Sequence, residues 1–138
     1  MWRLAILVLA SSVSAERPNI TVDGEIFGPS RTLTCTWFTN FENSRFDQCE
    51  DATGKLLHDG DSASINCVRP ICAQLHEAAR KAVGWTKPDA PWGTFTVVLV
   101  GRISLNPHEK RYIGDGTRTV LIERLKSVRP LNSPSLID

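Results

Sequence analysis

Residues 32–46 read TLTCTWFTNFENSRF and carry the strongest strand pattern in this 138-residue chain. Leu33, Cys35 and Trp37 alternate with threonines, so their side chains fall on one face of an extended backbone. The threonines and Phe38 make the opposite face β-branched and aromatic as well. A segment with strand-forming residues on both faces predicts a central and strongly bent strand.

Further strands and one helix are predicted on either side of this segment. Residues 20–22 indicate a short edge strand. On the C-terminal side, the pattern predicts a short strand over 63–67, a helix over 70–83, a long strand over 93–105 and a last strand over 118–128. The intervening residues 50–61, 85–92 and 106–117 are rich in polar residues, glycine or proline, which favour turns and connectors.

The helix has the clearest periodicity of these elements. Its apolar residues recur at the three- and four-residue spacing of one helix face: Ile71, Leu75, Ala78, Ala79, Ala82 and Val83. Pro70 suits the first turn, because a proline lacks the N–H that would be unpaired there, and Gly84 suits the end.

The order of the elements predicts the fold class. A bent strand, a polar hairpin region, a short strand, a helix, a long strand and a final strand follow one another. This is the order of a mainly β, five-stranded Greek-key barrel with one helix between strands 3 and 4, the oligonucleotide/oligosaccharide-binding (OB) architecture. The alternative is an α+β fold with the helix packed on an antiparallel sheet. We expect a single disulfide-bearing domain over residues 16–129 and a mobile C-terminal tail over 130–138.

Residues 1–15 have the three parts of a signal peptide. Arg3 makes a short basic start, an apolar run covers residues 4–10, and Val13 and Ala15 mark a small-residue cleavage site. The apolar run is too short to span a bilayer, and no later segment approaches the required length. We therefore expect a periplasmic or secreted protein without a membrane span.

Charge and motifs argue against several classes of function. Removal of Arg3 would bring the 16 basic residues level with the 15 acidic residues. A net charge near zero disfavours a general polyanion binder, so nucleic acid is not the expected partner. The sequence carries no phosphate loop, dinucleotide fingerprint, nucleophile elbow or metal-ligand set. We therefore expect no enzyme activity, no metal and no cofactor.

The chain has four cysteines, Cys35, Cys49, Cys67 and Cys72, which would meet an oxidising compartment after export. Their spacing leaves three pairings open. We favour Cys67 with Cys72, which would close a tight loop at the start of the helix, together with Cys35 and Cys49. The alternative is a zinc site, but no second close pair or histidine knuckle completes one.

The candidate binding residues lie in the loop after the long strand. His108, Lys110, Arg111 and Tyr112 combine charged donors with a flat aromatic side chain, which suits an anionic ligand or a partner surface. In an OB barrel this loop borders the usual ligand face. The tryptophans at positions 37, 85 and 92 are a second hypothesis, as residues that line a cleft, although tryptophans more often pack in a core or at its rim.

Residues 37–46, which read WFTNFENSRF, and the cysteine that follows resemble a pattern in small exported bacterial OB-fold-like proteins of uncharacterised function. In those proteins a phenylalanine-glutamate pair, a serine and a phenylalanine precede a cysteine in the first barrel strand, as they do here over residues 41–49. Residues 98–104 and 119–128 are similar to the closing strands of that group. The resemblance implies the barrel fold and carries over no activity.

These features favour an exported, non-catalytic and monomeric binding module of the periplasm or envelope, with an unknown ligand or protein partner. The first alternative is an inhibitor of a secreted hydrolase, because small disulfide-stapled exported domains often serve in that way. The second alternative is single-stranded nucleic-acid binding, which suits the barrel but lacks a basic groove and interleaved stacking aromatics. The fold class alone does not decide among the three.

We predict that export removes residues 1–15. Intact-mass analysis of protein from the exported fraction is expected to give a chain that begins at Glu16, because the charge, the apolar run and the small residues agree on a boundary after Ala15. An exported form that still begins at Met1 would contradict this prediction.

Overall fold

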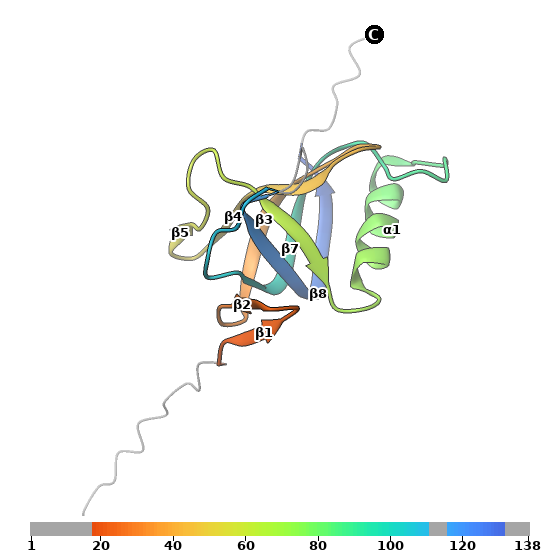
Figure 1. The fold of residues 1–138 in the computed structure, drawn as a ribbon. Coiled ribbons are helices and arrows are strands. Elements are labelled where there is room, and N and C mark those ends of the chain that lie inside the picture. Colours follow the sequence, from red (N-terminus) through yellow and green to blue (C-terminus); the bar gives the residue numbers. More distant parts are fainter. Residues whose placement is uncertain (1–17, 111–115, 132–138) are drawn as a thin grey trace, which may run out of the picture.

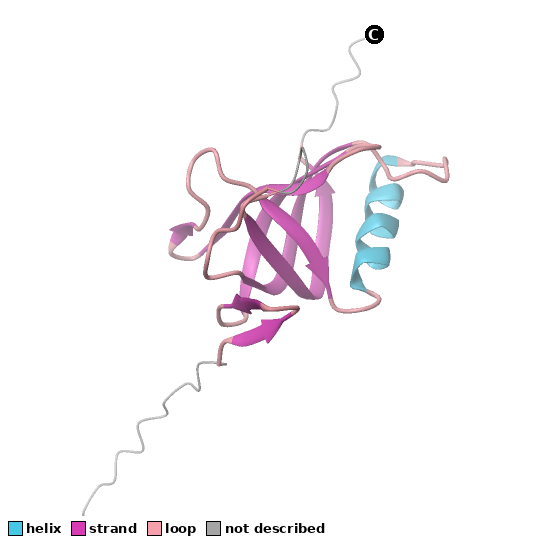
Figure 2. Ribbon diagram, viewed as in Figure 1, coloured by secondary structure: helices cyan, strands magenta, loops and turns pink. Residues whose placement is uncertain are grey.

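Five strands pair side by side in a closed ring, with one helix outside it (Figures 1 and 2). The computed structural model describes residues 18–110 and 116–131. In chain order the ring strands are β3 (Arg31–Thr39), β4 (Ser44–Asp51), β6 (Ala63–Cys67), β7 (Gly93–Ile103) and β8 (Arg118–Pro130). The order around the ring is β3-β7-β8-β6-β4, and pairing of β4 with β3 closes it.

Strand directions identify the topology. β6 and β8 run parallel, whereas the other neighbours in the ring are antiparallel. The helix α1 (Ile71–Val83) connects β6 to β7, which are the third and fourth ring strands along the chain. The fold is therefore the mainly β, OB-like barrel with one helix that the sequence predicts. The alternative of a helix on an open antiparallel sheet is wrong, because the sheet closes on itself.

The strand β3 pairs with two neighbours at the same time. It pairs with β7 from Arg31 to Thr39 and with β4 from Thr34 to Thr39. Against β4 the register shifts between Thr36 and Trp37, where β4 contributes one extra residue. Such a bulge increases the local twist and bends the pair, which a small barrel needs in order to close.

The strand predicted over residues 32–46 is in fact two strands joined by a tight turn. The side-chain oxygen of Asn40 accepts hydrogen bonds from the N–H groups of Glu42 (2.9 Å) and Asn43 (2.7 Å). The N–H of Asn40 donates to the carbonyl oxygen of Asn43 (2.8 Å). Asparagine favours such turns because its short amide side chain bonds the nearby backbone. The chain therefore reverses here, and residues 44–46 belong to β4.

The barrel interior holds the apolar residues that alternate along the strands. Its fully buried residues include Leu33, Cys35, Trp37, Phe46, Phe95, Val97, Leu99, Val120 and Ile122. Leu75 and Ala79 of α1 belong to the same cluster, so the helix packs its apolar face on the barrel. The Trp37 indole N–H donates to the hydroxyl of Ser44 (2.8 Å), which satisfies the polar atom of this side chain. Burial of each large apolar side chain contributes about 1.5–3 kcal/mol to stability.

The helix has nearly the limits that the sequence predicts. It begins at Ile71, one residue after Pro70. It ends before Gly84, whose φ of 65° lies in the left-handed region that glycine adopts without strain. The N–H of Trp85 donates to the carbonyl oxygen of Arg80 (2.9 Å), which pairs one of the last helix carbonyls.

Three short strands lie outside the ring: β1 (Ile20–Val22) and β2 (Glu25–Phe27), which form a hairpin, and β5 (Gly54–Lys55), which pairs with β4. The hairpin lies at the end of the barrel where β7 finishes (Figure 1). Arg102 fastens it there, since its guanidinium donates to the carbonyl oxygens of Pro18 (2.9 Å) and Gly28 (3.1 Å). Arg102 is 5% exposed, and an ion pair with Glu123 (3.2 Å) compensates its buried charge.

The last strand is longer than predicted. It continues to Pro130, and the N–H of Leu131 still donates to the carbonyl oxygen of Thr94 (2.9 Å). Residue 130 is therefore part of the barrel and not of a tail. The rest of the predicted tail, residues 132–138, and the predicted signal peptide lie outside the described residues. Within the described ranges, no helix is long and apolar enough to cross a membrane.

Both favoured disulfides are present. Cys35 and Cys49 face each other across β3 and β4 and are fully buried. Cys67 and Cys72 join the end of β6 to the first turn of α1 and are half-buried. The first bridge locks the strand pair that closes the ring, and the second fixes the direction in which the helix leaves the sheet.

We predict that the Cys35–Cys49 bridge contributes more stability than the Cys67–Cys72 bridge. The sequence separations are 14 and 5, and a longer loop loses more entropy when the unfolded chain is cross-linked. Replacement of the first pair by alanines is expected to lower the free energy of unfolding by about 3 kcal/mol, and replacement of the second pair by about 2 kcal/mol. Denaturant unfolding of both variants measures the difference, and a larger loss from the second pair would contradict the prediction.

Candidate functional site

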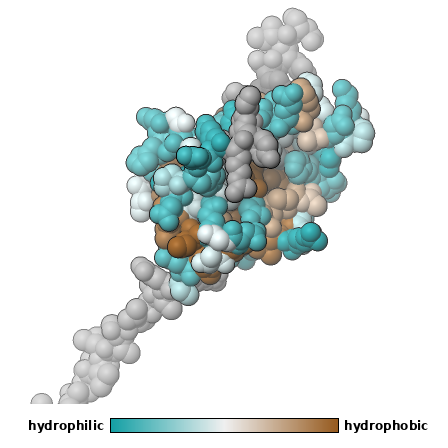
Figure 3. Space-filling view, viewed as in Figure 1, coloured by the Kyte–Doolittle hydropathy of each residue, from teal (hydrophilic) through white to brown (hydrophobic). Residues whose placement is uncertain are grey.

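A polar groove lies between the β1–β2 hairpin and the first residues of the loop 106–117. We call it the hairpin groove. Its volume is about 890 Å³, and its lining includes Glu25, Ser64, Asn106, His108, Lys110 and Thr119. Ile26 and Leu105, which are 42% and 45% exposed, form an apolar step at the same end of the barrel. On the side of the molecule drawn in Figure 3, apolar side chains lie among polar ones.

His108 is held through both of its ring nitrogens. Nε2 lies 3.1 Å from the Thr119 hydroxyl, and Nδ1 lies 3.2 Å from the backbone carbonyl oxygen of Glu109. The Thr119 hydroxyl donates to one carboxylate oxygen of Glu25 (3.2 Å), and the other oxygen lies 3.8 Å from Nε2. A carbonyl oxygen only accepts, so the contact with Glu109 suits an N–H at Nδ1.

This trio is not arranged for nucleophilic catalysis. In a hydroxyl–histidine–acid triad the carboxylate holds the ring nitrogen remote from the hydroxyl, whereas here Glu25 bonds the hydroxyl of Thr119 itself. Thr119 is also only 8% exposed. We interpret the trio as a clasp that holds the start of the loop against the hairpin. Within the described parts of the chain, no cluster of His, Cys, Asp and Glu side chains is able to hold a metal ion.

The two ends of the loop 106–117 are bonded to each other, and the second end is also bonded to β6. The N–H of His108 donates to the carbonyl oxygen of Thr117 (2.7 Å), and the N–H of Gly116 donates to the Ser64 hydroxyl (3.0 Å). A Cβ atom on Gly116 would lie 2.5 Å from the backbone of Ala63, so only glycine permits this close approach.

The hairpin groove contains two of the four residues that the sequence nominates for binding. His108 and Lys110 line it, whereas Arg111 and Tyr112 lie outside the described residues. Acidic residues share the lining: Asp23, Glu25 and Glu109. The described walls therefore carry mixed charge without the positive excess that an anionic ligand would need. Binding by this loop stays a prediction.

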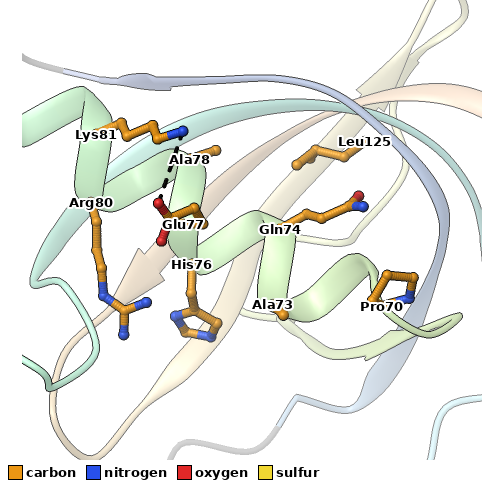
Figure 4. Close-up of a pocket in the computed structure, with 9 residues that line it drawn as sticks. All are labelled: Pro70, Ala73, Gln74, His76, Glu77, Ala78, Arg80, Lys81 and Leu125. Carbon is orange, nitrogen blue, oxygen red and sulfur yellow. Dashed lines mark ion pairs between the residues drawn. The ribbon is translucent and has the colours of Figure 1, made fainter.

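A second hollow, the helix groove, follows one side of α1 (Figure 4). Its volume is about 860 Å³, and it is lined by Pro70, Ala73, Gln74, His76, Glu77, Ala78, Arg80, Lys81 and Leu125. Its charged groups act within the fold. Glu77 pairs with Lys81 at 3.9 Å, and Arg80 donates to the carbonyl oxygens of Pro88 (3.3 Å) and Asp89 (3.4 Å). We interpret this groove as a consequence of helix packing and not as a binding site.

His76, on the wall of the helix groove, packs against the core. Its ring stands edge-on to Trp37, with the ring centroids 5.4 Å apart and the planes inclined by 81°. Burial of the ring, and secondly the charge of Arg80, lower the pKa of His76 below its usual value. The fold therefore favours the neutral imidazole, whose Nδ1 is buried without a partner among the described residues.

Three aromatic side chains gather at the opposite end of the barrel from the hairpin. Phe41 lies in the turn between β3 and β4, and Trp85 and Trp92 lie in the connector 84–92 between α1 and β7. The ring centroids of Phe41 and Trp92 are 5.6 Å apart, and those of Trp85 and Trp92 are 6.2 Å apart. Phe41 is 67% exposed and Trp92 is 54% exposed. We call these three side chains the aromatic platform.

Local hydrogen bonds hold the aromatic platform in place. The asparagine turn described above fixes the backbone at Phe41. The Trp85 indole N–H donates to the carbonyl oxygen of Asp89 (3.1 Å), and the Lys87 ammonium lies 5.4 Å from the centroid of the Trp85 ring. Large apolar side chains that are exposed together and held rigidly are typical of binding surfaces.

The amino-acid sequence indicates this platform only in part. Of the three tryptophans considered, Trp37 is buried in the core, whereas Trp85 and Trp92 stand together at the surface. Neither of these two lines the hairpin groove or the helix groove. The sequence pattern does not single out Phe41, because it predicts a continuous strand over residues 32–46. The signal that could have found it is the pair of asparagines around it, which mark an exposed turn.

Comparison with known proteins yields no relative of this chain, since no family model, no curated protein and no solved structure matches it. The resemblance to small exported bacterial proteins stays a prediction. Function is therefore inferred from the geometry and chemistry of the surfaces described above.

We predict that protonation of His76 destabilises the fold. The pKa of His76 is lower in the folded state than the value of about 6.5 expected for the unfolded chain, so the unfolded chain takes up the proton more readily. The contribution of neutral His76 to the free energy of unfolding is therefore fully present above about pH 6.5 and is lost as the pH falls below that value. The melting temperature of the wild type is expected to fall more between about pH 7.5 and 5.5 than that of His76→Gln, which cannot titrate.

The matched control for this experiment is His58→Gln, at an exposed position. It should keep the pH dependence of the wild type. A His76→Gln variant with an unchanged pH dependence would show that His76 does not contribute to it.

Proposed function

We propose that this chain is an exported, non-catalytic binding module whose ligand lies against the aromatic platform. The observation that carries the proposal is the joint exposure of Phe41 and Trp92, which are 67% and 54% accessible while their rings contact each other. A fold gains little from leaving two neighbouring aromatic side chains in water, whereas a ligand that covers them removes that apolar area from water.

The scaffold supports this role because the platform is fixed before any ligand arrives. Phe41 lies two residues after the end of β3, and Trp92 directly precedes β7, in a part of the barrel where Thr39 and Gly93 pair. The buried Cys35–Cys49 bridge stabilises the same strand pair further along. A preorganised surface loses less conformational entropy on binding, and this favours affinity.

Export is proposed on the pattern of residues 1–15 and on the cysteines. Two disulfides fit an oxidising compartment outside the cytoplasm. A periplasmic or secreted location would bring the platform into contact with components of the cell envelope, which are therefore the partners to test first.

We predict that the platform variants Phe41→Ala and Trp92→Ala lose binding to envelope material. The mature domain is immobilised through its N-terminus and exposed to an envelope extract of the producing cells. Truncation of a central aromatic contact typically costs about 2 kcal/mol or more, so the retained material should fall by more than about tenfold. Unchanged melting temperatures would separate loss of binding from loss of folding.

The matched control is Val68→Ala, which shortens an exposed apolar side chain outside the aromatic platform and outside both grooves. It should retain the envelope material that the wild type retains. Loss of binding in Lys110→Ala/Arg111→Ala with full binding by the platform variants would transfer the binding surface to the loop 106–117. Capture of a single secreted hydrolase, to the same extent by the wild type and by the platform variants, would favour the inhibitor alternative instead.

A further inference from the structure

We infer that the aromatic platform binds the flat face of pyranose rings, so that the ligand of this domain is an oligosaccharide. The inference rests on the proposed function and names the class of ligand for the same site. It follows from three properties of the platform: the shape that the rings make, the charge around them, and the hydrogen-bonding groups beside them.

The shape of the platform suits flat ligands. The planes of Phe41 and Trp92 are inclined by 39°, and those of Trp85 and Trp92 by 35°, so neighbouring rings are tilted against each other and are not stacked in parallel. None of the three rings lines the hairpin groove or the helix groove. A pyranose ring with equatorial substituents presents a flat face of C–H groups, which packs on an aromatic ring without needing a pocket.

The charge near the platform disfavours nucleic acid. The turn and the connector contain three exposed charged side chains, Glu42, Lys87 and Asp89, and the guanidinium of Arg80 reaches the connector from α1. Two of these four groups are acidic and two are basic. Both basic groups are already engaged, Lys87 over the Trp85 ring and Arg80 on two connector carbonyl oxygens, so the platform has no positive excess. Single-stranded nucleic acids need a basic groove beside the stacking rings, because their phosphates carry most of the affinity. A neutral ligand needs no basic groove.

An apolar peptide fits the platform less well than a sugar. The strand β3, which leads into Phe41, pairs on both sides with β4 and β7, so it offers no free edge for an added strand. Neither the hairpin groove nor the helix groove, which could receive an anchoring side chain, is lined by a residue of the platform.

Hydroxyl groups of a sugar find partners at the rim of the platform. The Glu42 carboxylate is exposed next to Phe41 in the chain. The Trp92 indole N–H donates to no acceptor among the described residues, whereas that of Trp85 is already bonded to the Asp89 carbonyl. A carboxylate acceptor and an indole donor beside an apolar surface match the alternation of hydroxyls and C–H faces on a sugar.

Titration of the mature domain with β-1,4-linked tetrasaccharides of glucose and of N-acetylglucosamine tests the inference, with tryptophan fluorescence and calorimetry as readouts. At least one tetrasaccharide should bind and change the fluorescence. Trp92→Ala should weaken that binding at least tenfold, and the conservative Trp92→Phe should weaken it less, because it keeps a stacking ring. The control variant Val68→Ala should bind as the wild type does.

Two comparison ligands distinguish the classes of partner. Tighter binding of a thymidine oligonucleotide, or of an apolar decapeptide, than of either tetrasaccharide would overturn the inference. If platform-dependent binding to the envelope extract is seen while both tetrasaccharides fail to bind, the inference is wrong and the proposed function stands. If platform-dependent binding to the extract is also absent, the proposed function falls as well.

Discussion

The structure depends on one strand that pairs with two partners at once. Because β3 bonds to β7 on one side and to β4 on the other, the sheet closes, and its central strands have no unpaired edge. The closure places Trp37 at the centre of the interior and brings Cys35 opposite Cys49. It also sets where the turn after β3 meets the start of β7, and this meeting point is the aromatic platform.

Local periodicity predicts much of this fold. The spacing of Leu75 and Ala79 defines a helix whose buried face is the one observed, and the alternation around Cys35 and Trp37 defines the inner face of β3. What periodicity does not resolve is the reversal at Asn40. Aromatic and β-branched residues continue through it, so the turn is marked by one side chain that bonds the backbone and not by any change of pattern.

Neither candidate surface is contained in one stretch of sequence. Phe41 and Trp92 meet because Thr39 pairs with Gly93, and Glu25 meets His108 because a hairpin packs across the end of β7. These contacts depend on which elements pair and in which register. The order of elements along the chain predicts the fold class but not these pairings. The composition of the loop after the long strand favours a binding role, yet two of its four candidate binding residues lie outside the described residues.

The clamp made by Arg102 has a consequence for how the domain is presented. It binds the carbonyl oxygen of Pro18 at the hairpin end, so the chain enters the barrel there. The platform lies at the other end of β7, ten residues away along an 11-residue strand, which is about 30 Å. A domain anchored or fused through its N-terminal side therefore points its aromatic face away from the attachment. The N–H of Leu131 bonds the carbonyl oxygen of Thr94 beside the platform, so a protein fused after Leu131 would lie close to the aromatic face instead.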